Sequence, residues 1–436
     1  MSVKNKIIII IFLFIVLIPD KLQAQINTIS PYSRYGIGDL VNKDFSQSNA
    51  LGGIGIGLRT PYHLNIANPA SYNAIDTLSF IFEFGMKDRV TQLRTSDMDQ
   101  TFNSINLDFV SIGFPVTKWW AGSIGIVPFS NVGYNIVDSA DLDDIGLVEY
   151  QYQGEGGINQ FYIGNAFSLF KGFSIGFNAS YLFGSMNYNG KAFLLEQDNV
   201  QNYYTYDSTI VGDIYLNYGA QYSFNIGKNY SLTLGAIFNN KQNIHALKTT
   251  TWELRDDGGN ITYTSQDSSE SNEGNIVLPD NYGFGFMLSD TKDKILVGFD
   301  YYHQDWSKST FFNENDSLRN SNKLALGIQY TPDQTSAKYW KRIRFRIGGY
   351  YSSTYLNLKN QQLDDFGITF GFGLPPLARQ KSSFYIKGRK YKTSFNLGFQ
   401  LGRRGTMNNE LIREDYAVIS LYMTLYDIWF VKQKFD

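Results

Sequence analysis

The chain has 436 residues and a formal net charge of −2 at pH 7, so it has no basic excess of the kind that nucleic-acid binding needs. Cysteine is absent, which excludes disulfides, thiol nucleophiles and thiolate metal sites. Aromatic residues make up 16% of the chain, more than a soluble core needs, and the aromatic girdles of a membrane barrel are one place for them.

The N-terminus has the layout of a secretory signal peptide. Lys4 and Lys6 precede an apolar run over residues 7–18, and the small residue Ala24 follows at the expected cleavage point. The apolar run is shorter than the about 20 residues that a spanning helix needs. We therefore predict a signal peptide at 1–24; the alternative is an N-terminal membrane anchor.

Two kinds of sequence follow the signal peptide. Residues 25–76 are rich in Gly, Asn, Ser and Pro and show no sustained alternation. From Thr77 onward apolar residues alternate with small or polar ones, most clearly at 172–184 and 391–402. Strict alternation is typical of strands with one apolar face. We predict an N-terminal plug over 25–76 and an all-β transmembrane barrel over 77–436.

The alternation predicts about fourteen strands. Their connections alternate between long segments, near 91–103, 135–157 and 189–207, and tight turns, near 116–118, 171 and 227–228. Bacterial outer-membrane barrels sort their loops by length in this way, and an even strand number returns both termini to the periplasm. A soluble β-protein is the alternative. The expected strands lie at roughly 77–90, 104–115, 119–134, 158–170, 172–188, 208–226, 229–250, 280–290, 292–306, 321–331, 340–356, 365–374, 382–402 and 413–432.

Two stretches of the expected plug resemble a known family. Leu51–Gly57 reads LGGIGIG, and Ala67–Ser71 reads ANPAS. Together they resemble the hatch of the FadL/TodX-type outer-membrane transporters (the OMPP1 family), in which an Asn-Pro-Ala motif precedes fourteen strands. The opening at Ser30–Tyr35 departs from the familiar members, which indicates a divergent branch. The resemblance implies that hatch and ligand-binding positions include Gly53, Gly55, Asn68, Pro69 and Ala70.

The same resemblance implies passive uptake of hydrophobic or amphipathic molecules, such as long-chain fatty acids or hydrocarbons. The ligand would leave sideways through a kinked strand. Pro128, next to Phe129, interrupts one expected strand, and a proline removes a ladder hydrogen bond. Asn165 lies on the apolar face of the following strand. We expect these residues to flank a lateral gate; an ordinary β-bulge at Pro128 is the alternative.

Three arginines share one face of the expected strand at 340–356. Arg342, Arg344 and Arg346 would be costly on the lipid side, so they are expected to point into the lumen. Two interpretations remain open: a charge network that holds the plug, or a site for the anionic head group of an amphipathic ligand. The acidic residues at inward positions are Glu83, Asp108, Asp213 and Asp300.

No constellation indicates catalysis, a metal or a cofactor. His63, His245 and His303 are scattered, and His303 with Asp305 is the only local pair that a hydrolase could use. Gly53, Gly55 and Gly57 do not stand between a strand and a helix, which excludes a dinucleotide loop. The aspartates between residues 138 and 144 do not match the calcium-loop spacing and are expected to form a solvated acidic loop.

Two functions remain for a non-enzymatic barrel in the cell outer membrane. The first is a channel, whose partners would be membrane lipid and a hydrophobic small molecule. The second is an accessory barrel subunit of an envelope secretion or outer-membrane assembly complex. A continuous apolar route behind the plug would favour the channel, and a sealed lumen with large partner-facing loops would favour the subunit.

Overall fold

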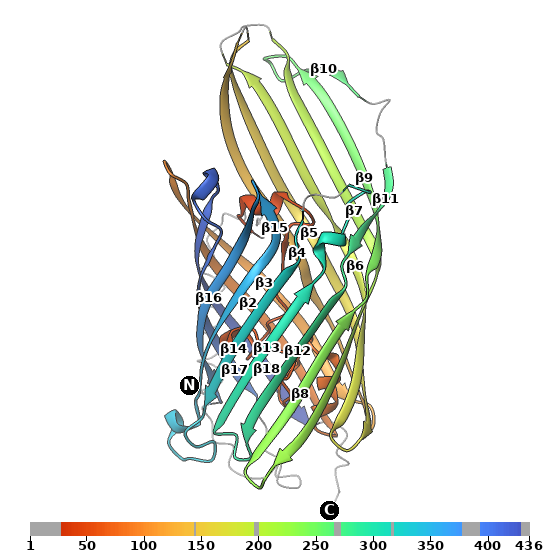
Figure 1. Ribbon diagram of the computed structural model, residues 1–436, viewed down its shortest axis with the longest axis vertical. Helices are drawn as coiled ribbons and strands as arrows, with labels where there is room; N and C mark the ends of the chain where they lie inside the picture. The colour runs from red at the N-terminus through yellow and green to blue at the C-terminus, as the bar shows by residue number, and fades with distance from the viewer. Residues whose placement is uncertain are drawn as a thin grey trace, which may run out of the picture.

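The computed structural model describes residues 28–143, 145–195, 200–265, 272–314, 318–376 and 393–428. The expected signal peptide at 1–24 lies outside the described residues. The described chain forms a closed antiparallel barrel of 14 strands, with β18 pairing back onto β2 (Figure 1). The 18-stranded sheet also contains β1 from the plug, β10 from an extracellular connection, and two wall strands that are each broken into two parts, β8/β9 and β11/β12.

The strand bounds agree with the predicted alternation through most of the wall. The strands are β1 (Asp39–Leu40), β2 (Ser79–Arg94), β3 (Asp99–Pro115), β4 (Trp120–Leu142), β5 (Gly146–Phe170), β6 (Phe173–Leu194), β7 (Asn202–Ile226), β8 (Tyr230–Asn239), β9 (Gln242–Arg255), β10 (Ile261–Thr264), β11 (Asn272–Leu278), β12 (Asn281–Asp290), β13 (Ile295–Gln304), β14 (Ser321–Tyr330), β15 (Arg344–Leu358), β16 (Gln361–Leu374), β17 (Ser394–Arg404) and β18 (Arg413–Ile428). The first part of the strand expected at 382–402 lies outside the described residues.

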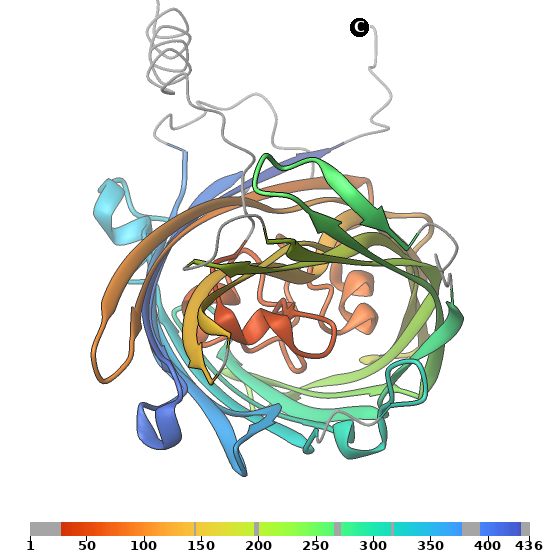
Figure 2. The ribbon, with the colours of Figure 1, turned by 90° about the horizontal axis from the view of Figure 1, so that it is seen from above.

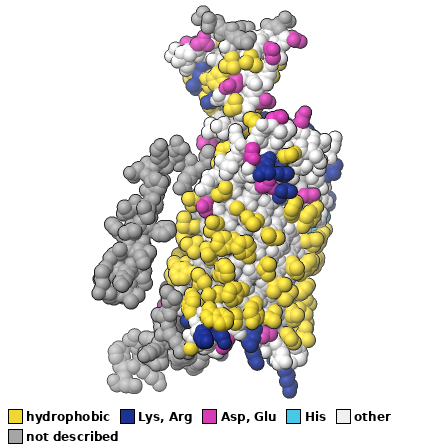
Figure 3. Space-filling model, turned by 90° about the vertical axis from the view of Figure 1, so that its left-hand side faces the viewer, with side chains coloured by type: hydrophobic (Ala, Val, Ile, Leu, Met, Phe, Trp, Pro, Cys, Tyr) yellow, Lys and Arg dark blue, Asp and Glu magenta, His cyan; other side chains and the backbone are white. Residues whose placement is uncertain are grey.

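The outer face of the barrel is apolar. Leu326, Ile347 and Ile368 are half-exposed on neighbouring strands, and the residues directly before and after each of them are small or polar. Figure 3 shows a broad band of hydrophobic side chains on one face of the barrel, with Lys and Arg below it. Lipid offers no partner to backbone N–H and C=O groups, so the closed ladder is what lets these strands cross the bilayer. Among the described residues, no helix combines the length and apolarity that a membrane crossing requires.

The segments expected as long connections are largely strand. β2 and β3 are joined by a tight turn after Arg94, and residues 135–142, 146–157 and 189–194 continue β4, β5 and β6. Strands β4 to β7 and β9 therefore rise as a tall sheet above one side of the barrel (Figure 1). Above the bilayer neither face of a strand contacts lipid, so polar residues and tyrosines replace the alternation on which the strand prediction depended.

The N-terminal segment from Thr28 to about Leu78 lies inside the barrel (Figure 2). It contains the 3-10 helices η1 (Pro31–Arg34), η2 (Asn49–Leu51) and η3 (Pro69–Ala74), and the two-residue strand β1. Many of its apolar side chains are fully buried, including Leu51, Ile54 and Tyr72. We call this segment the plug.

Candidate functional site

The Asn-Pro-Ala motif anchors the plug to the wall. The Asn68 side chain is buried; its oxygen accepts from Ala70 N at 3.2 Å and so caps η3, and Pro69 occupies the first turn. Its amide donates to Ile56 O at 2.8 Å and to Ala220 O of β7 at 3.2 Å. The Asn68 side chain thus caps the start of η3 and links it both to the plug backbone at Ile56 and to β7.

Glycines of the wall let the plug backbone lie against the sheet. A Cβ at Gly219 would lie 2.1 Å from Asn68 Oδ1, and a Cβ at Gly235 would lie 2.0 Å from Ile56 O. On the plug side, Gly55 N and Ile56 N both donate to the buried Asp300 of β13, the latter at 2.7 Å. Gly55 and Asp300, both predicted from the sequence, therefore meet, and their contact holds the plug.

Two further predicted acidic residues connect to the plug, Glu83 directly and Asp108 through Lys87. Glu83 of β2 lies 2.8 Å from His63 Nδ1 and accepts from Leu64 N at 3.2 Å. Asp108 of β3 lies 3.1 Å from Lys87 Nζ, which also approaches Asp44 of the plug at 3.7 Å. These contacts fit the plug-holding interpretation of the inward acidic residues.

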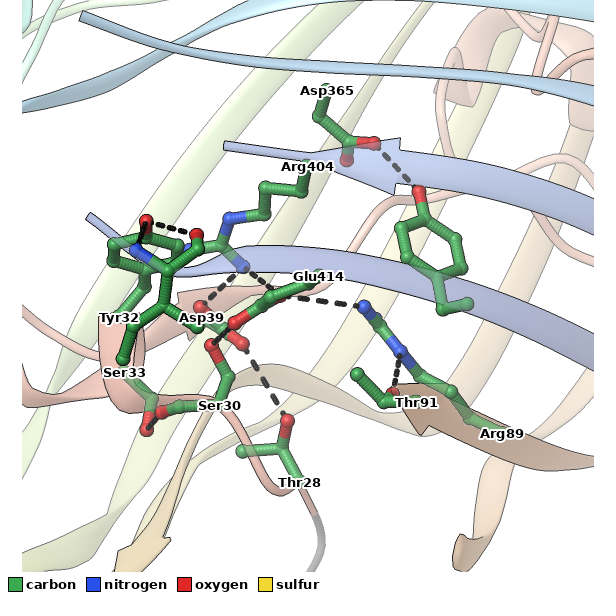
Figure 4. A network of polar contacts seen from close by, with 12 residues as sticks. Thr28, Ser30, Tyr32, Ser33, Asp39, Arg89, Thr91, Asp365, Arg404 and Glu414 are labelled. Carbon is green, nitrogen blue, oxygen red and sulfur yellow. Dashed lines mark hydrogen bonds and ion pairs between the residues drawn. The ribbon is translucent and has the colours of Figure 1, made fainter. Parts of the chain in front are cut away.

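A third polar cluster ties the start of the plug to the neighbouring strands β17, β18 and β2 (Figure 4). Arg404 of β17 lies 2.8 Å from Asp39 and 3.9 Å from Glu414 of β18. Glu414 is fully buried, accepts from Ser30 Oγ at 2.5 Å and lies 3.8 Å from Arg89. Arg404 and Glu414 were not predicted, because they stand at strand ends where the alternation gives no signal.

The arginine prediction needs correction. Arg342 lies in the periplasmic 3-10 helix η6 (Tyr339–Arg342), outside the ladder, with its guanidinium 5.3 Å from the Tyr339 ring centroid. Arg346 is buried, but it donates to the neutral Gln329 at 2.8 Å and Asn396 at 2.6 Å.

The predicted pairing of these arginines with carboxylates is also not seen in the described chain. Among the described residues, neither Arg344 nor Arg346 forms an ion pair. The predicted acidic residue Asp213 accepts from His245 N at 2.9 Å, beside the break between β8 and β9. Among the described residues, the wall cations that pair with plug carboxylates are instead Lys87, with Asp44, and Arg404, with Asp39, while Arg89 contacts Glu414 of the wall.

The barrel wall separates between β3 and β4. Within the described chain their ladder has six pairs, from Pro115↔Ala121 up to Val110↔Ile126, and stops there. Above that level β3 pairs with β2 up to Asp99, and β4 pairs with β5 up to Leu142. The barrel therefore has a lateral split in its extracellular half.

The plug covers this split from inside. Its strand β1 pairs with the edge of β4 that β3 leaves free, at Asp39↔Asn131 and Leu40↔Ser130. In addition, Val41 N donates a hydrogen bond to Phe129 O at 3.0 Å. On the other side of the split, the centroid of the Phe45 ring lies 4.6 Å from the centroid of the Phe109 ring of β3. The short strand and the aromatic contact thus both cover the opening.

The expected gate residues lie only partly at this split. The β4–β5 register shifts between Pro128 and Ser130, where Phe129 is the extra residue, but the two strands stay paired on both sides of it, so no opening separates them. Asn165 is far from Pro128 along the strands: it pairs with Gly122 and accepts from Trp120 Nε1 at 3.0 Å. Its polar side chain is satisfied within an aromatic cluster near the periplasmic turn.

A cavity of about 230 Å³ lies between the plug and the wall. Pro128 and Phe129 line it beside the split, while Lys43, Asp44, Asp365 and Arg404 are among its other lining residues. Its lining is therefore mixed in polarity and carries both signs of charge, unlike the mostly apolar pockets that bind hydrocarbon-like ligands.

The one pair considered for hydrolysis does meet. His303 Nε2 lies 2.9 Å from Asp305, and hydrogen bonds from His303 and Lys308 hold the pKa of the Asp305 carboxyl below its usual value. The other ring nitrogen, Nδ1, contacts Asn322 Oδ1 at 2.7 Å, which leaves no free nitrogen to activate a nucleophile. In the described parts of the chain, no group of three or more His, Asp or Glu could hold a metal ion.

Comparison with known proteins gives a family and a fold. A family model described as BamG matches residues 3–436, whereas no curated protein sequence matches the chain. The Pseudomonas putida toluene transporter TodX superposes with a TM-score of 0.58 at 14% identity, over 91% of this chain and 100% of that one. A Pseudomonas aeruginosa FadL homologue gives 0.55 at 13% identity, over 89% and 99%, and the Ralstonia pickettii toluene transporter TbuX gives 0.54 at 12% identity, over 88% and 98%. The FadL-type fold expected from the hatch motif is confirmed, and these matches are transport channels rather than enzymes.

Proposed function

The chain belongs to the BamG family, and on this premise we propose that it is a plugged barrel subunit of an outer-membrane assembly complex rather than a free channel. The family name points to partners in the envelope. The fold is that of channels, but this chain has charged groups and hydrogen bonds where a route for hydrophobic molecules would pass.

The observation that carries the proposal is the way in which the plug is held. Ser30 and Asp39 contact β17 and β18, His63 contacts β2, and Asn68 contacts β7. A mobile hatch would have to break several of these contacts together, including those to the fully buried Glu414. A shell closed this firmly suits a structural role, with the tall extracellular sheet available for partners.

Purification of the tagged full chain from native membranes in mild detergent tests this role. Mass spectrometry of the same sample identifies both proteins and small lipophilic molecules. We expect envelope proteins in stoichiometric amount and no stoichiometric lipophile, together with low conductance of the isolated chain in planar bilayers. A bound hydrophobic molecule without a protein partner would overturn the proposal.

The lateral split favours a second candidate, the passive uptake of hydrophobic molecules with exit into the bilayer. The cavity reaches Phe129 beside the split, and the plug covers the gap through β1, through the backbone hydrogen bond from Ser30 to Gly133 and through the Phe45–Phe109 ring contact. If β1 left the edge of β4, the cavity would face the lipid. The resemblance to FadL-type transporters makes long-chain fatty acids or hydrocarbons the substrates to test.

A disulfide lock separates the two candidates, because the chain has no cysteine of its own. Leu40 and Ser130 are directly paired, so Leu40→Cys with Ser130→Cys places two thiols at cross-strand distance, about 4.5–5.5 Å between Cα atoms. Under the subunit proposal, the oxidised and reduced proteins support the same co-purification and the same cell growth. Uptake of a labelled fatty acid that stops on oxidation and returns on reduction would favour the channel; the Leu40→Cys single variant is the control.

A further inference from the structure

The edge of β4 continues above the plug without a neighbouring strand. Within the described chain, residues Asn135–Leu142 pair with β5 on one side and with no strand on the other. Figure 1 shows this edge as the open side of the tall sheet. At about 3.3 Å per residue the open stretch is about 26 Å long.

The direction of the free backbone groups follows from the contacts below. Phe129 O and Gly133 O accept from the plug at Val41 N and Ser30 N, so odd-numbered residues of β4 point away from β5. Because these directions alternate along a strand, Asn135, Val137, Ser139 and Asp141 present their N–H and C=O groups to the open side. Side chains do not cover this edge: Val137 is 57% exposed, and Ser139 and Asp141 are also exposed.

The same edge already accepts an added strand lower down. β1 pairs there through Asp39 and Leu40, and the upper stretch continues directly from that contact. Long open edges invite pairing, and proteins usually blunt them with charged side chains, above all lysine, with proline or with a bulge. Asn135–Leu142 contains neither lysine nor proline, and its ladder with β5 is regular.

The charge at this edge indicates what kind of strand could bind. The open edge of β4 and the part of β5 next to it are acidic. They carry Asp138, Asp141 and Glu149 and no Lys or Arg over residues 135–142 and 146–153. Asp138 and Asp141 project from opposite faces of β4, so a paired strand would meet negative charge on both faces. A second copy of this chain would bring the same carboxylates and would be repelled.

We propose that the β4 edge from Asn135 to Leu142 is a docking site for an extended segment of a partner envelope protein that carries Lys or Arg. The segment adds one strand to the tall sheet on the extracellular side, in line with β1. Backbone hydrogen bonds supply affinity, and the carboxylates select a basic sequence. This inference rests on the proposed function, because it says where the partner of that function binds.

In vivo photo-cross-linking from this edge tests the proposal. A benzophenone amino acid replaces Ser139 in the full chain, and mass spectrometry identifies the cross-linked peptide. We expect a Lys- or Arg-containing peptide of another envelope protein. In the same background, Val137→Pro removes one outward N–H while keeping the β4–β5 ladder, and we expect the adduct to fall about tenfold or more.

Val137→Thr is the matched control, because it keeps the N–H, and its adduct should equal that of the parent chain. Retention of the compact form on unheated gels shows that each variant still folds. An adduct to a second copy of this chain, an adduct unaffected by Val137→Pro, or no adduct would each overturn the docking site. If partner proteins still co-purify in those cases, the proposed subunit role stands; if none does, the subunit role fails as well.

Discussion

Removal of the Arg404 charge should release the start of the plug. Arg404 lies 2.8 Å from Asp39, 3.9 Å from Glu414 and 5.2 Å from the Tyr32 ring centroid. In Arg404→Met the side-chain length is largely kept, but two carboxylates remain without this cation. Glu414 is fully buried and Asp39 is only 13% exposed, so water screens them little.

Breaking a buried ion pair by removing one partner costs about 3–5 kcal/mol. We assign this loss to plug docking, because the 14-stranded ladder does not depend on the Arg404 side chain. Local opening of residues 28–41 should therefore rise by between about a hundredfold and a few thousandfold. Hydrogen–deuterium exchange of peptides from this segment, in detergent micelles, measures the change directly.

Arg403→Met is the matched control. Arg403 is the next residue and lies 2.6 Å from Asp415, but its side chain is 47% exposed, so the loss should be at most about 1 kcal/mol. Glu414→Gln added to Arg404→Met should restore part of the protection, since it removes a buried charge that has lost one of its two neighbouring cations. Equal exchange in the two arginine variants would refute the reasoning.

Two further predictions concern the other plug anchors. Asn68→Ala removes the cap of η3 and the bond to Ile56 O, so plug docking should weaken by about 1–2 kcal/mol, seen as faster exchange around residues 68–74 while the barrel stays folded. Unchanged exchange there would contradict the anchoring role. Gly235→Ala places a Cβ 2.0 Å from Ile56 O and should displace the plug, raising its cleavage by added protease and the conductance in planar bilayers. Gly122→Ala, whose Cβ meets nothing nearer than 3.4 Å, should match the parent chain in both assays.

The sequence by itself determined the barrel within the bilayer. Lipid on one side and a packed lumen on the other impose alternation on each strand locally, so strands such as β6 and β17 could be found residue by residue. The segment at 25–76 was set apart as a plug because it lacks alternation, and its Asn-Pro-Ala motif resembles the hatch of the FadL/TodX-type transporters. Asp300, Glu83 and Asp108 were found by the same rule, as polar residues on inward positions.

Only the tertiary structure decided where the wall parts and how the plug closes it. Pro128 and Asn165 look alike as defects in a strand pattern, yet one lies next to the split and the other is satisfied by the Trp120 indole. The sequence also did not show how far β4 and β5 extend above the bilayer, because water on both faces of a strand removes the alternation.

The charged residues that hold the plug could not be predicted from the sequence for a related reason. Ser30 and Glu414 are 384 residues apart in the chain, and no local pattern reports which carboxylate a distant serine or arginine will meet. Closure of the barrel brings them together, and burial then makes the removal of either partner costly. Local solvent contact thus fixed the strands, while the contacts that hold the plug depend on which strands become neighbours.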